Sequence, residues 1–300
     1  MFVDERITER ILYGSSMSDG FRNSKHNVLS GNDQRALLDP YVLFRSDMLT
    51  LDMDAVIQQD VVKFHRRMGG GFKSFRVKHP HDYSTNDGDG VPTSNDGRCE
   101  EDIPGWCITA WYDDDSIPTA TRRRVKKPNV GTVVVGIRDD FNNPHQIVEI
   151  TDIPDPDPDV IRWTVDNTTG IINFTANSQN VVTNITQAAQ AVITLGAAHG
   201  RVVGDSFHVS IVVGMTEING LRCTILAIGL TTVTVDIDST LFTAYTSGGE
   251  TNTAPQDSET ITAGCYFDIP CVFQDPEMEI DFINFQILSA NFGVIETYNP

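Results

Sequence analysis

Short β-branched runs bounded by glycine, such as Gly131-Thr132-Val133-Val134-Val135-Gly136, follow one another from Trp106 to the end of the chain. A second example is Thr231-Thr232-Val233-Thr234-Val235, and glycine, proline, asparagine and aspartate stand between such runs. Short β-branched segments separated by turn residues are typical of strands. The sequence therefore predicts a mainly β protein over most of its length.

One segment has helical periodicity instead. Between about residues 53 and 68 the apolar side chains recur at spacings of 4, 3 and 4, at Ile57, Val61, Phe64 and Met68. Asp52 or Asp54 can cap this segment, and three glycines follow it. We expect one long helix that packs these four side chains on a sheet, which makes the predicted class α+β.

The charge is large and unevenly distributed. The 300 residues have a net charge of −19, and residues 131–300 contribute −17 of it. A strongly acidic chain argues against non-specific nucleic-acid binding. The uneven distribution suits a protein whose two regions face different neighbours, and adaptation to a salty habitat explains it equally well. No apolar run approaches the roughly 20 residues of a membrane-spanning helix, and the first residues lack the features of a secretory signal.

Two groups of residues suggest metal ligands, and in both the sequence favours a simpler interpretation. The stretch Asn86-Asp87-Gly88-Asp89-Gly90 lacks the glutamate that closes a calcium loop, so we expect a turn. The tract Asp113–Asp115 is expected to be a solvated loop. His79, His81 and Asp82 are potential ligands of one metal ion, but we expect both imidazoles at the surface around Pro80.

No catalytic, cofactor or metal site is predicted. The five cysteines form no C-x-x-C pair and are odd in number, which argues against a disulfide framework. Cys265 and Cys271 share a strand face with Phe267, Ile269 and Phe273, so we expect these two to be small buried apolar residues. The chain contains no nucleophile elbow, no phosphate-binding glycine loop and no dinucleotide fingerprint. The sequence therefore predicts a protein that is not an enzyme and has no cofactor.

The densest basic run lies between residues 122 and 127. Its charges could bind phosphate, but in so acidic a protein we expect them to pair with an acidic neighbouring surface. The predicted subunit-interface residues are Arg122, Arg123, Arg124, Lys126 and Lys127.

Further along, residues 155–159 (DPDPD) are expected to form a stiff loop whose charges repel one another.

Several segments, in order, resemble the distal tail proteins of long-tailed (siphovirus-type) phages and of gene transfer agents. They cover roughly residues 7–180 and 258–296 and include ILYGSS (11–16), SGNDQR (30–35), FHRRMGGGFKSFR (64–76), DY (82–83), VDNTTGIINF (165–174) and TAGCYFDIPCVF (262–273). The resemblance implies a tail-tube-like β-sandwich that forms a homo-hexameric ring at the tail tip of a virion. It also implies a tail tube protein above the ring, a baseplate hub protein below it, and genomic DNA in transit through it.

About seventy residues interrupt this resemblance. They contain AHG (198–200), VGD (203–205), GMTEING (214–220) and TAYTSGG (243–249), and they resemble the non-catalytic β domain of ubiquitin-activating enzymes. We therefore predict a ring-forming core at residues 1–181 and 255–300, with a small β-barrel or sandwich inserted at 182–254. Cys223 is expected to be a strand residue of this module.

The residues and the two resemblances suggest three functions to compare. The first is a structural ring protein, made in the host cytoplasm and assembled into the virion. The alternative is an adhesin of the tail tip that binds host-surface glycans through the insert. A cell-wall hydrolase would need a nucleophile or a pair of carboxylates, and no such signature is present. For the ring we expect a channel lining poor in lysine and arginine, with the basic run outside the lumen.

Overall fold

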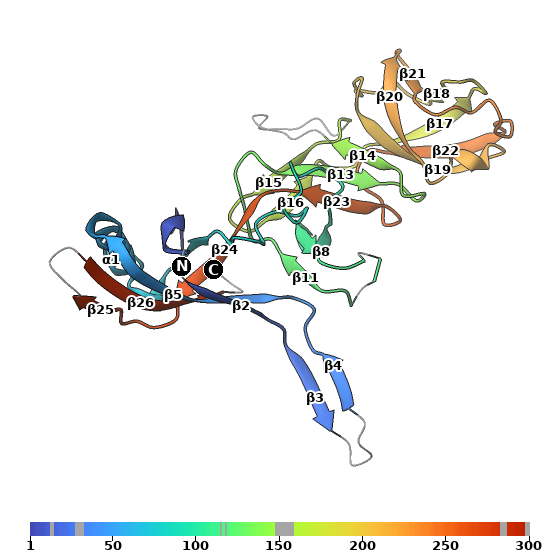
Figure 1. The fold of residues 1–300 in the computed structure, drawn as a ribbon. Helices are drawn as coiled ribbons and strands as arrows, with labels where there is room; N and C mark the ends of the chain where they lie inside the picture. Colours follow the sequence, from blue (N-terminus) through green and yellow to red (C-terminus); the bar gives the residue numbers. More distant parts are fainter. Residues whose placement is uncertain are drawn as a thin grey trace.

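In the computed structural model, residues 1–12, 15–27, 33–114, 116–117, 119–147, 159–282 and 287–297 are described. The molecule is elongated, with a closed barrel at one end, two small sheets in the middle, and a helix-covered sheet that carries both chain termini (Figure 1). A hairpin arm projects from the side of this body. The prediction of a mainly β protein with one long helix is confirmed for the described residues.

The first sheet has the strand order β1-β6-β24-β26-β5-β2, with β12 paired to β24 and β25 paired to β26. Only the β1–β6 pair is parallel among the pairings described in it. Its strands are β1 (Phe2–Arg6), β2 (Ser16–Gly20), β5 (Leu43–Asp54), β6 (Ser74–Val77), β12 (Lys127–Pro128), β24 (Phe267–Phe273), β25 (Glu279–Phe282) and β26 (Ile287–Glu296). The 3-10 helices η1 (Glu9–Leu12) and η2 (Gly70–Phe72) flank it.

Helix α1 (Ala55–Met68) covers this sheet. Val61, Phe64 and Met68 are buried in one cluster with Phe75 and Phe273, as the spacing predicts, whereas the side chain of Ile57 lies outside the described residues. The helix ends at Gly69, whose φ of 67° is the left-handed conformation that glycine adopts without strain. Residues with β-branched or aromatic side chains supply the sheet face, so the amphipathic helix has an apolar surface to cover.

The middle of the molecule contains two four-stranded sheets and one strand pair. The first sheet has the order β14-β13-β23-β7 and the second β15-β16-β9-β8. The strands are β7 (Gly97–Arg98), β8 (Glu100–Asp102), β9 (Gly105–Cys107), β10 (Thr109–Trp111), β11 (Arg122–Arg124), β13 (Val134–Arg138), β14 (Pro144–Ile147), β15 (Trp163–Asp166), β16 (Ile171–Phe174) and β23 (Thr260–Gly264). Their apolar side chains form one buried cluster around Trp163. The chain then passes from β23 directly into β24, which joins the middle to the first sheet.

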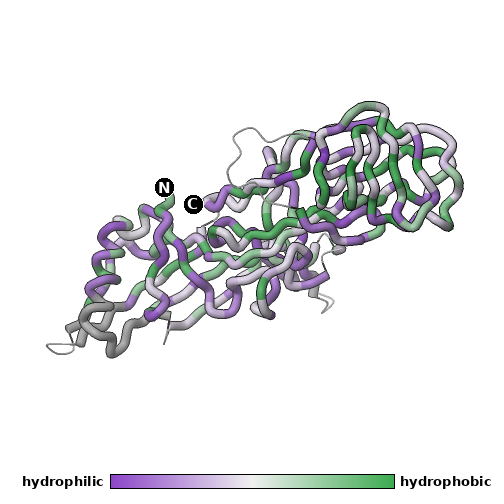
Figure 2. The backbone as a smooth tube through the Cα atoms, turned by 90° about the horizontal axis from the view of Figure 1, so that it is seen from above, coloured by the Kyte–Doolittle hydropathy of each residue, from purple (hydrophilic) through white to green (hydrophobic). Residues whose placement is uncertain are grey.

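The far end is a closed barrel with the strand order β17-β18-β21-β20-β19-β22. These strands are β17 (Gln179–Ile185), β18 (Val192–Leu195), β19 (Ser206–Val213), β20 (Arg222–Ile228), β21 (Thr232–Val235) and β22 (Ser247–Asn252), with the 3-10 helix η3 (Thr216–Ile218) between β19 and β20. Polar and apolar residues alternate along them (Figure 2), because one face of each strand lines a separate buried core around Phe207. The barrel spans Gln179–Asn252 and overlaps most of the segment 182–254 that the sequence assigns to an inserted module.

Among the described residues, no helix has the length and apolarity required to cross a lipid bilayer. The predicted DPDPD loop falls on residues 155–159, of which only Asp159 is described.

Candidate functional site

The projecting arm consists of β3 (Asn23–Asn27) and β4 (Asp33–Leu37), paired antiparallel from Asn23↔Leu37 to Asn27↔Asp33 (Figure 1). Of the side chains described in residues 21–26 and 35–38, all except Ser24 are exposed. They include three apolar side chains at its base, Phe21, Leu37 and Leu38, which are 39%, 44% and 64% exposed. A two-stranded hairpin without a core beneath it is marginally stable in water. The arm is therefore an element that a partner surface would stabilise.

The root of the arm is held rigidly by the basic run. Arg122 N donates to Pro40 O and Val42 N donates to Arg122 O, each at 3.1 Å. The Arg122 guanidinium lies over the rings of Tyr41 and Trp111, at 5.0 and 4.6 Å from their centroids, and also pairs with Glu100. Stacked, paired guanidinium groups of this kind are strongly oriented. The Tyr41 hydroxyl donates to Glu100, and burial together with this carboxylate raises the pKa of Tyr41.

Arg123 joins three distant parts of the chain beside this root. It contacts Asp82 after β6 at 2.6 Å, Glu296 at the end of β26 at 2.5 Å, and Asp19 in β2 at 3.5 Å. Burial lowers the pKa of Arg123, but the carboxylates of Glu296 and Asp82 outweigh this effect and raise it overall. A buried cation with several carboxylate partners stays charged. Because Arg123 pairs with Asp19 of β2, it helps to fix the position of the strand that leads into the arm.

The basic run is thus used within the chain. Arg122, Arg123 and Lys127 are buried, and Arg124 and Lys126 are half-buried beside Glu100 and Asp102. The Lys127 ammonium lies 3.5 Å from the centroid of the Phe2 ring and donates to Thr168 O. The acidic surface that the sequence predicts as their partner belongs to the same chain. The carboxylates that pair with Arg122 and Arg123 are thus intramolecular, and Lys127 is buried without a carboxylate partner among its described contacts. A subunit-interface role for the run stays a prediction.

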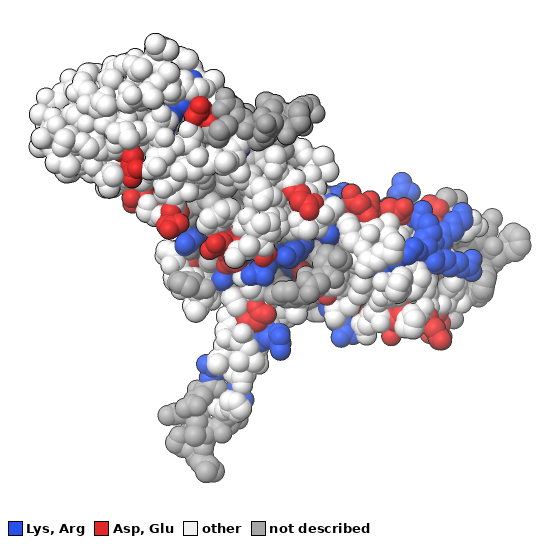
Figure 3. All heavy atoms as spheres, turned by 180° about the vertical axis from the view of Figure 1, so that it is seen from behind, with Lys and Arg blue, Asp and Glu red and all other residues white. Residues whose placement is uncertain are grey.

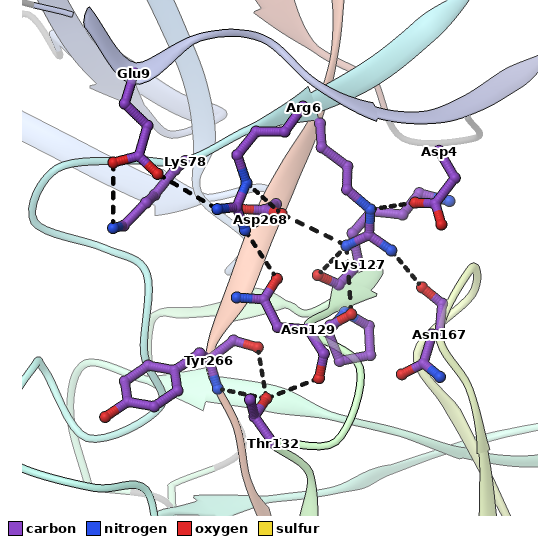
Figure 4. A network of polar contacts seen from close by, with 12 residues as sticks. Asp4, Arg6, Glu9, Lys78, Lys127, Asn129, Thr132, Asn167, Tyr266 and Asp268 are labelled. Carbon is purple, nitrogen blue, oxygen red and sulfur yellow. Dashed lines mark hydrogen bonds and ion pairs between the residues drawn. The ribbon is translucent and has the colours of Figure 1, made fainter.

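A second charged joint connects the first sheet to the middle of the molecule (Figure 4). Arg76 in β6 pairs with Asp4 of β1 and donates to the carbonyl oxygens of Lys127 and Asn167, each at 2.9 Å. Arg6 donates to Asp268 at 2.8 and 3.1 Å. No local pattern in the sequence predicts this joint. An arginine inside the apolar strand Phe75–Val77 is the signal that could have indicated it, since a buried charge requires partners.

The residues considered as metal ligands have other roles in the structure. Asn86–Gly90 is a turn, as expected, in which Asp87 and Gly88 have φ values of 54° and 79°. His79 is buried, which makes the prediction of a surface position for it wrong, whereas His81 is exposed. The Nδ1 atom of His79 accepts hydrogen bonds from the backbone N–H groups of His81 and Asp82, so it caps the turn at Pro80. Within the described residues, no group of three or more His, Cys, Asp or Glu side chains has a geometry suited to a metal ion.

All five cysteines are buried and free, which confirms the burial predicted for Cys265 and Cys271. Burial raises the pKa of each thiol, to about 11 for Cys107, so the thiols stay protonated and are poor nucleophiles. Cys223 lies in strand β20, as expected.

Charge is distributed unevenly over the surface. On the face shown in Figure 3, charged side chains gather on the arm, the middle and the first sheet, whereas the barrel surface has few of them. The barrel presents many exposed threonine, valine and leucine side chains instead.

A scan of the sequence against protein-family models finds no match, and a search among curated proteins returns no significant match. The resemblance to distal tail proteins therefore stays a prediction. The function is inferred from the residues themselves and from the geometry of the arm, its root and the barrel.

Proposed function

We propose that this protein is a structural component of the tail tip of a phage or phage-like particle, where six copies form a ring between the tail tube and the baseplate hub. The observation that carries the proposal is the hairpin arm of β3 and β4, which extends from the body with both faces exposed. An arm of this kind needs a surface to lie against, and in a homo-oligomer that surface belongs to the next copy.

The placement of the arm favours a ring over a two-fold dimer. The arm continues from β2, an edge strand of the first sheet, and β1 is the strand at the opposite edge. An arm that leaves one side of a subunit and contacts a different surface of its neighbour makes a head-to-tail interface, and such interfaces form rings when the rotation between neighbours closes. The paired arginines at its root support the same role, since they give the arm a defined direction.

The burial of the basic run supports passage of DNA through such a ring. Side chains that are buried in the single chain remain buried after assembly, so Arg122, Arg123 and Lys127 are kept away from a channel lining. Lysine and arginine on the lining would retard a sliding polyanion through counterion release at each phosphate contact. The net charge of −19 also disfavours binding of DNA to the ring, because like charges repel.

The alternative function, a glycan-binding adhesin that uses the insert, gains no support from the barrel. Phe207 is fully buried, and Phe242 and Tyr245 pack against the barrel core. These are the aromatic residues of segment 179–252, and each is engaged in packing.

The test is the number of copies in the purified oligomer, measured by native mass spectrometry. We expect six copies for the natural chain and loss of the oligomer when Phe21, Leu37 and Leu38 are all changed to serine. The matched control changes Leu226, Ile228 and Leu230 of the barrel to serine, since these are also three exposed apolar residues. A natural chain that is monomeric at every concentration, or an arm variant that still forms six copies, would refute the proposal.

A further inference from the structure

A cleft of about 360 Å³ lies at the seam between the first sheet and the middle of the molecule. Its lining residues are Arg6, Lys78, Tyr83, Asn129, Tyr266 and Phe267. They come from the end of β1, the segment after β6, the segment after β12, and the start of β24. The volume is at the lower end of the range for small-molecule sites, about 300–1,000 Å³.

One side of the cleft is an aromatic platform. The rings of Tyr83 and Tyr266 are almost parallel, with an interplanar angle of 13° and centroids 6.2 Å apart. Both side chains are half-buried, and the Lys78 ammonium lies over the Tyr83 ring at 5.3 Å from its centroid, so only part of each side chain remains accessible to a ligand. Aromatic faces of this kind offer a flat apolar surface with polar hydroxyl groups at the edge.

The turn at residues 86–90 fixes this platform. The Tyr266 hydroxyl donates to Gly90 O at 3.0 Å, and a Cβ atom at Gly88 would lie 3.1 Å from the Tyr83 hydroxyl oxygen. The glycines of this acidic turn therefore allow close contact with the tyrosines. Backbone and side-chain contacts hold both rings before any ligand arrives, which lowers the entropic cost of binding.

The other side of the cleft is polar but electrically balanced (Figure 4). Arg6 pairs with the buried Asp268, and Lys78 and Arg6 both contact Glu9 at 3.4 and 3.3 Å. Asn129 Oδ1 accepts from Arg6 at 3.2 Å, and its amide nitrogen points to the side on which Tyr266 lies. Because carboxylates of the same chain neutralise the two cations, the cleft presents donors and acceptors together and does not select an anion.

We propose that this cleft binds a neutral saccharide of one or two rings. A pyranose ring combines an apolar face of C–H groups with a rim of hydroxyl groups, each of which is both a donor and an acceptor. The platform of Tyr83 and Tyr266 matches the apolar face. Asn129 and Lys78 match the rim. This proposal is independent of ring assembly and places a glycan site on the body of the molecule, away from the barrel.

The test is saturation-transfer NMR on the whole purified chain with four probes: glucose, galactose, N-acetylglucosamine and galacturonate. We expect at least one neutral probe to bind, with affinity that changes little with salt. The changes Tyr266→Ala and Tyr83→Ala should each weaken binding roughly tenfold, which corresponds to about 1.4 kcal/mol, because each removes part of the aromatic surface.

Two controls separate loss of the site from loss of folding. Tyr266→Phe keeps the ring and should retain most of the affinity, and Phe72→Ala removes an exposed ring that does not line the cleft. Asn129→Asp replaces an amide donor with an acceptor beside Arg6 and should weaken binding without unfolding the joint. Absence of binding by all four probes would overturn the proposal. Binding of galacturonate alone, or binding unaffected by Tyr266→Ala, would do so as well. Copy number, measured on the same variants, reports on assembly separately.

Discussion

Arg222 and Glu259 form a fully buried, bidentate ion pair where the barrel joins the middle of the molecule. Arg222 Nε lies 2.6 Å from Glu259 Oε1, Nη2 lies 2.7 Å from Oε2, and both side chains have no exposed surface. Arg222 also donates to Thr253 O at 3.1 Å. Since β20 carries Arg222 and Glu259 immediately precedes β23, the pair ties the barrel to the strand that leads into the first sheet.

Removing one partner of this pair should destabilise the chain strongly. We expect Arg222→Met to lower the free energy of unfolding by about 3–5 kcal/mol, because Glu259 would be left as an uncompensated buried charge. Urea unfolding monitored by circular dichroism measures the loss. Replacing both residues by methionine should cost less than the single change, and Glu101→Gln at an exposed site should change the stability by less than about 0.5 kcal/mol. A double variant less stable than the single one would contradict the argument.

The helix core should depend on Phe64. Its ring makes edge contacts with Phe75 at 5.0 Å and with Phe273 at 6.3 Å between centroids. We expect Phe64→Ala to lower the free energy of unfolding by roughly 3–5 kcal/mol through lost burial and a residual cavity. Phe72→Ala is the matched control, because Phe72 is 72% exposed. A loss below about 1 kcal/mol at Phe64 would show that another face of the helix supports the packing.

The barrel should be dispensable for assembly. Its two ends lie side by side, since Ser178 N donates to Thr253 Oγ1 at 2.8 Å and Thr253 N donates to Ser178 O at 3.2 Å. A short glycine-containing turn in place of residues 179–252 should leave a folded chain with an unchanged copy number. The deletion needs Glu259→Gln as well, because Arg222 is removed with the barrel. A truncated chain that folds and stays monomeric would mean that the barrel forms part of the ring interface.

Lys127 should make stability depend on pH above neutrality. Burial lowers its pKa from 10.5 to about 8, and the positive charge of Arg76 acts in the same direction. Between about pH 8 and 10.5 the unfolded chain therefore holds a proton that the folded chain has released, so this group's contribution to the free energy of unfolding rises with pH. The stability difference between the natural chain and Lys127→Met should shift in favour of the natural chain across this range. A difference that stays constant with pH would disprove the assignment.

The sequence by itself determined the features that depend on neighbouring residues. The β-branched runs set the strand-rich class, and the apolar spacing of Val61, Phe64 and Met68 set the helix and its buried face. The hairpin of β15 and β16 follows from its Asp166–Gly170 turn, and the cysteines are buried because small apolar side chains partition to the core. In each case a periodicity or a turn residue within about ten positions is sufficient to predict the feature.

Only the tertiary structure determined which charges meet and which segments stand alone. Arg123 and Glu296 are 173 residues apart in the sequence, and Arg6 and Asp268 are 262 apart, so no local pattern pairs them. The same topology buries His79 beside Phe44, leaves β3 and β4 without a sheet beneath them, and brings Tyr83 against Tyr266. Long-range contacts of this kind depend on how the strands are ordered in the sheets, and strand order is a property of the whole chain.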